Sequence, residues 1–167
     1  QALGRFYRNS LNSGRQMLSV REELDIIKNY MTIINIRYED KVIIAYDVDE
    51  SLLNVIILKL ILQPLIENAV HHGLRQKQGT GELRISVKAQ SDDMMELSVW
   101  DNGAGIPQDK IPQILRGEYR TKKSGFGLYS VKQRVELFYG IENALDIFSD
   151  FGNWTEIKVK IPRIEEE

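Results

Sequence analysis

The spacing of hydrophobic residues along the chain predicts a mixture of helices and short strands. Apolar residues recur every three or four positions over 24–38, which predicts an amphipathic helix that ends near residues 39–40. Ser19 and Glu22 form a capping-box pattern, in which each residue satisfies a free backbone amide of the other, and this pattern places the start of the helix. A second helix is expected over 125–139.

Runs of alternating or β-branched residues predict several strands. The expected strands lie at 42–48, 83–89, 96–100, 144–149 and 155–161. Helices and strands mix here without strict βαβ alternation. The expected fold class is therefore α+β, a two-layer sandwich in which helices cover one face of a mixed, mostly antiparallel sheet.

Two longer segments do not fit a simple pattern. The apolar segment 52–74 contains Pro64, and because proline removes a helical hydrogen bond, we expect a kink or a new helical start there. Gly73 lies where the C-cap of that helix would fall. Residues 101–124 are rich in glycine and charge with weak periodicity, which predicts a long mobile loop.

Composition narrows the classes of function. The chain has 167 residues, 43% hydrophobic and 28% charged, which fits one ordinary globular domain. A net charge of −2 gives no reason to expect nucleic acid as a partner, and the absence of cysteine excludes disulfides and cysteine–metal sites. The longest apolar run, 55–62, is too short to span a bilayer. Because the sequence starts at Gln1 without methionine, we expect a piece of a longer protein.

The first segment with candidate chemistry contains Glu67, Asn68, His71 and His72. On a helix, Asn68 shares a face with both histidines, and Glu67 shares one with His71. Burying such a polar cluster costs free energy, which a bound metal–phosphate would offset, since an amide oxygen can ligate Mg²⁺. A helix C-terminus with satisfied polar caps is the alternative.

Two glycine-rich segments follow. Asp101, Gly103 and Gly105 place a carboxylate at a strand end, where it can accept a hydrogen bond from an exocyclic amine while the glycines admit a flat ring. A plain Asp-Asn-Gly turn is the alternative. Gly125 and Gly127 lead into a helix N-terminus, which favours an anion, although many helices begin after glycine. The three-glycine dinucleotide fingerprint is absent.

Taken together, the three segments resemble the N, G1 and G2 boxes of the histidine kinase, gyrase and chaperone ATPase superfamily. A finer resemblance is to LytS/YehU-like sensor histidine kinases, and it covers 20–161, most of the chain. The residues that carry it lie in the segments 21–24, 62–73 and 127–140. This resemblance implies the Bergerat fold, an α/β sandwich that binds ATP between its helices and its sheet.

The resemblance also implies roles for individual residues. Asn68 would ligate Mg²⁺, Glu67 would be the catalytic carboxylate that polarises the attacking imidazole or positions the metal, and Asp101 would hold the adenine amine. The residues expected to shape the adenine pocket, the lid hinge and the approach to the phosphates are Gly103, Gly105, Ile106, Gly125, Gly127 and Leu128.

The chain departs from the group's pattern in two places. The group often has lysine at the position of His71, so we expect Lys122 and Lys123 to supply positive charge from the lid, with His71 and His72 beside the nucleotide. The group's phosphorylated histidine lies in an upstream Pro-His-Phe-like motif, which this sequence lacks. We expect neither of the two histidines present to be the phosphoacceptor.

The function implied is transfer of the γ-phosphoryl group of ATP to a histidine on a dimerisation helix missing from this sequence, and then to a response regulator. Residues 1–14 would form the end of the second dimerisation helix, 15–162 would form the catalytic domain, and 163–167 a tail. The whole protein would be a homodimeric bacterial sensor in the inner membrane, with this domain in the cytoplasm. An anti-sigma-factor-type serine kinase and a non-catalytic module with a degenerate nucleotide site remain alternatives.

Overall fold

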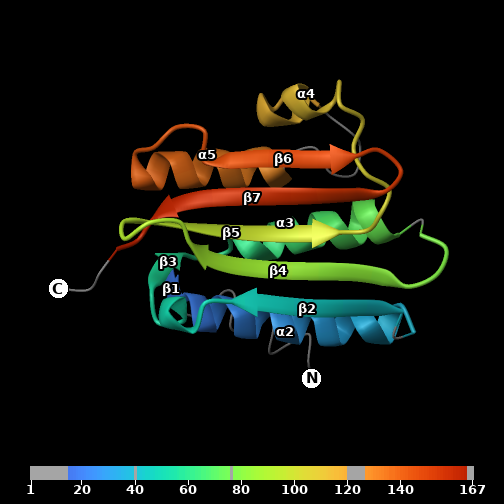
Figure 1. Ribbon diagram of the computed structural model, residues 1–167, viewed down its shortest axis with the longest axis horizontal. Helices are drawn as coiled ribbons and strands as arrows, with labels where there is room; N and C mark the ends of the chain where they lie inside the picture. The colour runs from blue at the N-terminus through green and yellow to red at the C-terminus, as the bar shows by residue number, and fades with distance from the viewer. Residues whose placement is uncertain (1–14, 40, 76, 120–126, 165–167) are drawn as a thin grey trace.

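A single five-stranded sheet forms one layer of the fold (Figure 1). The computed structural model describes residues 15–39, 41–75, 77–119 and 127–164. In spatial order the strands are β2 (Val42–Val48), β4 (Gly81–Ala89), β5 (Met94–Asp101), β7 (Trp154–Pro162) and β6 (Leu145–Asp150). β2 runs parallel to β4 and every other neighbouring pair is antiparallel, so the mixed, mostly antiparallel sheet is confirmed.

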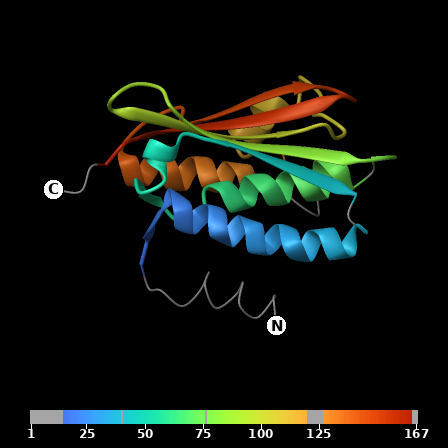
Figure 2. The ribbon, with the colours of Figure 1, turned by 60° about the horizontal axis from the view of Figure 1, so that its bottom comes forward.

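Helices cover one face of this sheet and leave the other open (Figure 2). The covering helices are α2 (Val20–Arg37), α3 (Leu62–Asn68) and α5 (Gly127–Tyr139). A short helix, α4 (Ile111–Leu115), contacts α5 and β6 near the edge of the sheet. The expected two-layer sandwich is confirmed.

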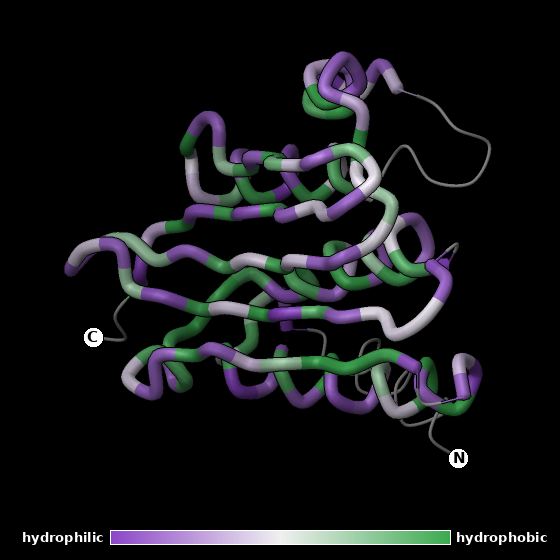
Figure 3. The backbone as a smooth tube through the Cα atoms, turned by 45° about the vertical axis from the view of Figure 1, so that its right-hand side comes forward, coloured by the Kyte–Doolittle hydropathy of each residue, from purple (hydrophilic) through white to green (hydrophobic). Residues whose placement is uncertain are grey.

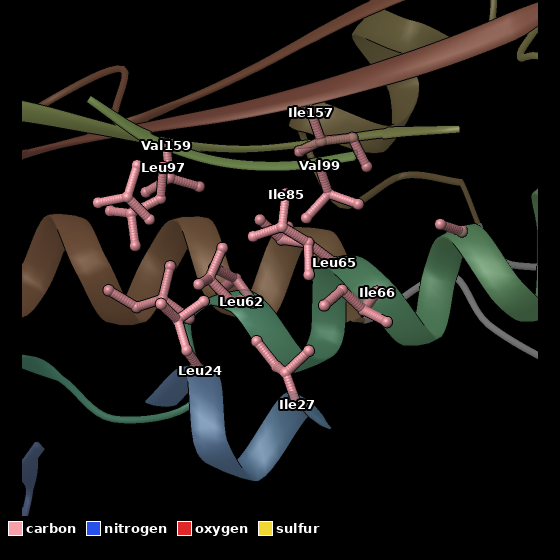
Figure 4. Packing of buried hydrophobic residues seen from close by; sticks show 14 of the residues in the cluster. Leu24, Ile27, Leu62, Leu65, Ile66, Ile85, Leu97, Val99, Ile157 and Val159 are labelled. Carbon is pink, nitrogen blue, oxygen red and sulfur yellow. The ribbon is translucent and has the colours of Figure 1, made fainter. Parts of the chain in front are cut away.

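The core lies between the two layers because the strands alternate in polarity. In β4, Leu83, Ile85 and Val87 are buried while Glu82 and Arg84 are exposed, and Figure 3 shows hydrophilic residues alternating with hydrophobic ones along the strands. The buried side chains of the sheet meet those of α2 and α3 in one cluster (Figure 4). Truncating one of these Leu or Ile side chains to Ala would cost about 2–5 kcal/mol.

The start of α2 follows the expected capping box. Ser19 Oγ accepts a hydrogen bond from the Glu22 amide at 3.2 Å, and Glu22 Oε2 accepts one from the Ser19 amide at 2.8 Å. The helix ends at Arg37 with Tyr38 as its C-cap, slightly before the expected end. Of the expected end at 39–40, Glu39 adopts a left-handed φ of 53°, and residue 40 lies outside the described residues.

The apolar segment 52–74 forms several secondary-structure elements and not one continuous helix. A 3₁₀ turn, η1 (Glu50–Leu52), precedes the short strand β3 (Ile56–Leu58), which pairs with β1 (Met17–Ser19) in a second sheet that the hydrophobic pattern did not predict. The helix starts anew at Leu62, so Pro64 falls in its first turn, where a missing amide leaves no hydrogen bond unmade.

The remaining boundaries agree to within two residues where they are described. The strands expected at 83–89 and 96–100 begin two residues earlier, and that at 42–48 is as expected. The expected helix 125–139 is described from Gly127 onward, because 125–126 lie outside the described residues. The expected loop over 101–124 is wrong in part, since it contains α4.

Candidate functional site

A cavity of about 1060 Å³ opens beside the C-terminal end of α3, close to the upper limit of the size range of small-molecule sites. Its walls come from the end of α2, from α3, from the segment after β5 and from the start of α5. The lining residues are Arg37, Tyr38, Pro64, Glu67, Asn68, His71, His72, Arg75, Gly105, Ile106, Pro107, Lys110, Ile114, Tyr119, Gly127 and Leu128.

The cavity gathers most of the residues expected from the sequence. Eight of them line it: Glu67, Asn68, His71, His72, Gly105, Ile106, Gly127 and Leu128. Asp101 and Gly103 are not among the lining residues and are buried next to the backbone of Gly73. Lys122, Lys123 and Gly125 lie outside the described residues.

Asp101 is the carboxylate at the C-terminal end of β5, and only 2% of it is exposed. Burial raises the pKa of Asp101 to about 6, while the Gly103 amide and the charge of Lys77 oppose this increase. Gly103 N donates to Asp101 Oδ1 at 2.9 Å. A second oxygen therefore remains for an amine donor, and near pH 6 this group switches between donor and acceptor.

Two glycines allow the backbone to approach closely at this carboxylate. A Cβ on Gly73 would lie 2.8 Å from Asp101 Cγ, and a Cβ on Gly103 would overlap the Gly73 backbone. Ala104 N donates to Gly73 O at 2.9 Å, which ties the end of the helix to the segment after β5. Gly73 lacks the left-handed φ of the expected C-cap, so that interpretation is wrong and close packing explains the glycine.

At position 105, the backbone conformation as well as close packing requires a glycine. Its φ is +70°, and an added Cβ would lie 2.8 Å from the Cα of Phe151 in the β6–β7 turn. Ile106 N is fixed next to it by a 2.7 Å hydrogen bond to Ser149 Oγ. The segment after β5 is thus held against the end of β6, and it presents Gly105 and Ile106 to the cavity.

The polar cluster follows an unusual change of helix type. After Asn68 the chain continues as a π-helix, η2 (Ala69–Leu74), with hydrogen bonds that span five residues. The wider turn still brings both histidines to the cavity wall with Glu67 and Asn68, as the sequence predicted. Both histidine side chains are exposed. Desolvation of the part of the His72 ring that the protein covers, with His71 and Arg75 nearby, lowers the pKa of His72, which favours its neutral form near pH 7.

Glu67 and Asn68 differ in their hydrogen bonding. Glu67 Oε1 accepts a 3.0 Å hydrogen bond from Gln63 Nε2, one helical turn earlier, which orients its carboxylate. The half-buried side chain of Asn68 has no hydrogen bond to any other described residue. Its amide oxygen is therefore available to a ligand in the cavity.

Sequence reasoning missed part of the lining. Arg37, Tyr38, Arg75 and Lys110 also border the cavity, and the Lys110 ammonium lies 5.6 Å from the centre of the Tyr119 ring. None of these residues falls in a recognisable motif, and the first two come from the end of α2, about thirty positions before Asn68. The only available signal was a loose excess of basic residues around the motifs.

Two classes of site are not found in the part of the chain that is described. No three or more His, Cys, Asp or Glu side chains there gather in a way that would hold a metal ion. No helix among these residues is both long and apolar enough to cross a membrane.

Comparison with known proteins agrees with this geometry. A family model described as histidine kinase-, DNA gyrase B-, and HSP90-like ATPase matches residues 54–165, and one described as histidine kinase matches 1–42. Sensor histidine kinase YesM of Bacillus subtilis is 32% identical over 97% of this chain, and sensor protein LytS of the same organism is 31% identical over 94%. The chain spans 27% of the length of each.

Solved structures share the fold at lower identity. The catalytic domain of histidine kinase ThkA aligns with a TM-score of 0.64 at 18% identity, covering 89% of this chain and 99% of that one. Full-length ShkA in complex with AMPPNP aligns with a TM-score of 0.66 at 17% identity, covering 99% of this chain and 35% of that one.

The resemblance to LytS-type sensor kinases is thereby confirmed. The family match covers more than half of the chain and includes all the residues expected to bind ATP. This chain therefore belongs to the family of histidine kinase-, DNA gyrase B- and HSP90-like ATPases.

Proposed function

We propose that this chain is the ATP-binding catalytic domain of a two-component sensor histidine kinase. In this proposal it transfers the γ-phosphoryl group of ATP to a histidine on a separate dimerisation segment. One observation carries the proposal: a single cavity joins the Glu67–Asn68 wall to the glycine segment that directly follows Asp101. Purine recognition and phosphate chemistry can thus take place at two ends of one site.

Asp101 would recognise the adenine. Its carboxylate keeps one oxygen for the exocyclic amine, and burial excludes competing water. Gly103, Gly105 and Ile106 would form the wall next to the purine ring. Gly103 packs on the Gly73 backbone, Gly105 lies against the β6–β7 turn, and Ile106 N is bonded to Ser149 of β6.

The phosphates would lie toward the start of α5. This helix opens at Gly127 and Leu128 on the cavity wall, so its free amides and the positive end of its dipole favour an anion. Arg37, Arg75 and Lys110 add positive charge around the same cavity. From the family resemblance, Gly125, Lys122 and Lys123 would join them.

Mg²⁺ would be held by the Asn68 side-chain oxygen together with phosphate oxygens. The residues fit this ion, since Mg²⁺ commonly takes only one or two protein ligands and shares substrate phosphates, and Asn68 has an amide without a partner among the described residues. When bound, the ion would neutralise charge on the phosphates.

Glu67 would act on the incoming imidazole. Its carboxylate is oriented by Gln63 and faces the same cavity as Asn68, so it can accept or orient the proton of a histidine nucleophile. Phosphoryl transfer depends mostly on positioning and electrostatics, which suits a site with few reactive groups. Neutral His72 would contribute hydrogen bonding to the nucleotide, beside His71, in place of a fixed charge.

The partners proposed are a dimerisation segment that carries the acceptor histidine and a response regulator that receives the phosphoryl group. The whole protein would be a homodimer, with this domain in the cytoplasm and an anchor in the bacterial inner membrane. Within this chain, 1–14 would form the end of a dimerisation helix, 15–162 the catalytic domain and 163–167 a tail. The match of a histidine kinase family model to residues 1–42 supports a kinase origin for the first of these segments.

The test has two parts. Calorimetric titration with Mg-ATP should show binding that Asp101→Ala abolishes. Incubation with [γ-³²P]ATP and an upstream segment containing its histidine should then give a phosphate that is lost in acid. An acid-stable phosphate would instead indicate a serine kinase. Equal absence of binding in the wild type and in Asp101→Ala would indicate a non-catalytic module.

A further inference from the structure

The backbone that connects β3 to α3 is held by side chains from two other helices. Glu23 of α2 accepts hydrogen bonds from Leu60 N at 2.9 Å and from Leu62 N at 3.0 Å, one on each carboxylate oxygen. Arg134 of α5 donates through Nη2 to the carbonyl oxygens of Lys59 and Leu60, both at 2.9 Å. Two charged side chains thus form hydrogen bonds with the backbone of one short connection.

Both side chains form hydrogen bonds with the same peptide group. The peptide between Lys59 and Leu60 supplies its N–H to Glu23 and its C=O to Arg134. No peptide bond in the described structure is cis, and in a trans peptide these two groups point in opposite directions. Glu23 and Arg134 therefore hold this plane from opposite sides, as a clamp.

The burial of Glu23 indicates that the clamp is a specific arrangement. The residue is 0% exposed, and a buried carboxylate is unfavourable unless hydrogen bonds compensate it. Burial raises the pKa of Glu23, and the backbone amides of residues 60–63 oppose that increase.

The clamped connection also contains a strained residue. Leu60 has a φ of 59°, in the left-handed region that non-glycine residues rarely adopt. Such a conformation persists where the surroundings over-determine it, and it occurs most often near functional sites. Here the amide and the carbonyl of Leu60 are both fixed by the clamp.

The clamp links two helices that both line the cavity and pack against each other. Glu67 and Asn68 lie at the C-terminal end of α3, and Gly127 and Leu128 open α5. Glu23 fixes the start of α3, while Arg134 belongs to α5 itself. The clamp thus ties the start of one wall to the middle of the other.

We propose that Glu23 and Arg134 are positioning residues of the nucleotide site, which set the separation between α3 and α5. This proposal rests on the proposed function, because it assigns the clamp an effect on Mg-ATP binding. Neither residue lines the cavity, so each acts through the backbone of 59–62.

The test compares Glu23→Gln with Glu22→Gln. The glutamine at 23 keeps the shape of the side chain but replaces one acceptor by a donor that faces an amide. Glu22 is its neighbour in the same helical turn and holds only the α2 cap and Arg15, so it is the matched control. Both variants are titrated calorimetrically with Mg-ATP at a temperature where circular dichroism shows them folded.

Glu23→Gln should weaken Mg-ATP binding at least about tenfold relative to Glu22→Gln, because displacements near 1 Å in a site have effects of this order or larger. Arg134→Lys replaces the planar guanidinium group, so it should also weaken Mg-ATP binding. This variant takes the place of Glu23→Gln in the test if Glu23→Gln does not fold. A Kd of Glu23→Gln for Mg-ATP within about twofold of that of Glu22→Gln would overturn the proposal. The clamp would then contribute to the stability of the fold and not to nucleotide binding.

Amide spectra without nucleotide separate this proposal from the proposed function. If the wild type itself does not bind Mg-ATP, the proposed function fails. The ¹H–¹⁵N chemical shifts of the nucleotide-free protein then still test whether the clamp positions α3 relative to α5. Shifts in Glu23→Gln that extend from Leu60 and Leu62 to Asn68 and Gly127 support it. Shifts confined to residues near 59–62 would overturn it.

Discussion

The Gly73 backbone packs directly on the carboxyl group of Asp101, so that an added Cβ would lie 2.8 Å from Asp101 Cγ. The end of the π-helix therefore covers the one buried carboxylate of the site. This contact excludes water from Asp101, and the resulting burial is the largest cause of its raised pKa. A single glycine on the helix thus affects a titrating group on the sheet.

Gly73→Ala should disrupt this contact and abolish nucleotide binding. Crowding against Asp101 should also lower the free energy of unfolding by about 1–3 kcal/mol, measured by urea denaturation. Gly140→Ala is the control, since Gly140 has a φ of +65° but no atom within 4 Å of an added Cβ. The control should lose stability through backbone strain and keep its affinity for Mg-ATP. Full affinity in Gly73→Ala would contradict this account.

Mg-ATP affinity should depend on pH through Asp101. The ionised carboxylate accepts the adenine amine, and its pKa of about 6 means that protonation competes with binding below pH 6. Affinity should therefore fall by about tenfold per pH unit below pH 6 and level off above it. Calorimetric titrations from pH 5 to 7.5 test this. Asp101→Asn reveals the titration of the nucleotide alone, and the same pH profile in this variant would refute the assignment.

The same group should make the protein less stable as pH rises from about 4 to about 6. The folded pKa lies above the value of 3.8 for an exposed Asp, so the folded state binds the proton more tightly than the unfolded state. This contribution is full below pH 4 and lost above pH 6, and amounts to roughly 3 kcal/mol at most. Asp101→Asn should remove this slope, measured by urea denaturation across that window, and should not be less stable than wild type at pH 7.

Asn68→Ala should weaken ATP binding only when Mg²⁺ is present. With magnesium the loss should be on the order of tenfold or more, which corresponds to one interaction with a charged group. In EDTA, the two proteins should bind ATP with equal affinity. Stability should hardly change, since the amide makes no hydrogen bond to another described residue. A loss of equal size in EDTA would argue against magnesium ligation.

Glu67→Gln should reduce phosphoryl transfer and leave Mg-ATP affinity close to that of the wild type. Loss of a proton acceptor lowers such a rate by about 10²–10⁴-fold. Transfer is followed as acid-labile label on an upstream segment that contains the acceptor histidine. Gln63→Ala removes only the hydrogen bond that orients Glu67, so it should give a smaller decrease. A transfer rate unchanged in Glu67→Gln would exclude the proposed role.

Much of the fold could be predicted because it follows from local patterns. The strands alternate in polarity, and Ser19 and Glu22 carry a complete capping box within four residues. β1 and β3 were missed because each has three residues, too few for alternation to appear, and their pairing joins positions about forty residues apart. The spacing of Asp101 from Gly103 and Gly105 was likewise enough to predict a site.

The rest of the site depended on contacts between distant segments. Gly73 looked like a helix cap because nothing in its neighbourhood in sequence indicates that the end of β5 lies against it. Arg37 and Tyr38 belong to an ordinary amphipathic helix until the fold brings that helix end to the cavity. Such features arise only from the packing of α2, α3 and the sheet.

The pairing of β1 with β3 has a mechanical consequence. Met17 to Ser19 form an antiparallel ladder with Ile56 to Leu58, and Lys59 N donates to Gln16 O at 3.0 Å. The chain before Met17 therefore joins the domain through a two-stranded ribbon, whereas a flexible tether would absorb its motion. The ribbon leads into the residues just before α3, so a displacement of the upstream chain would act first next to the helix that carries Asn68.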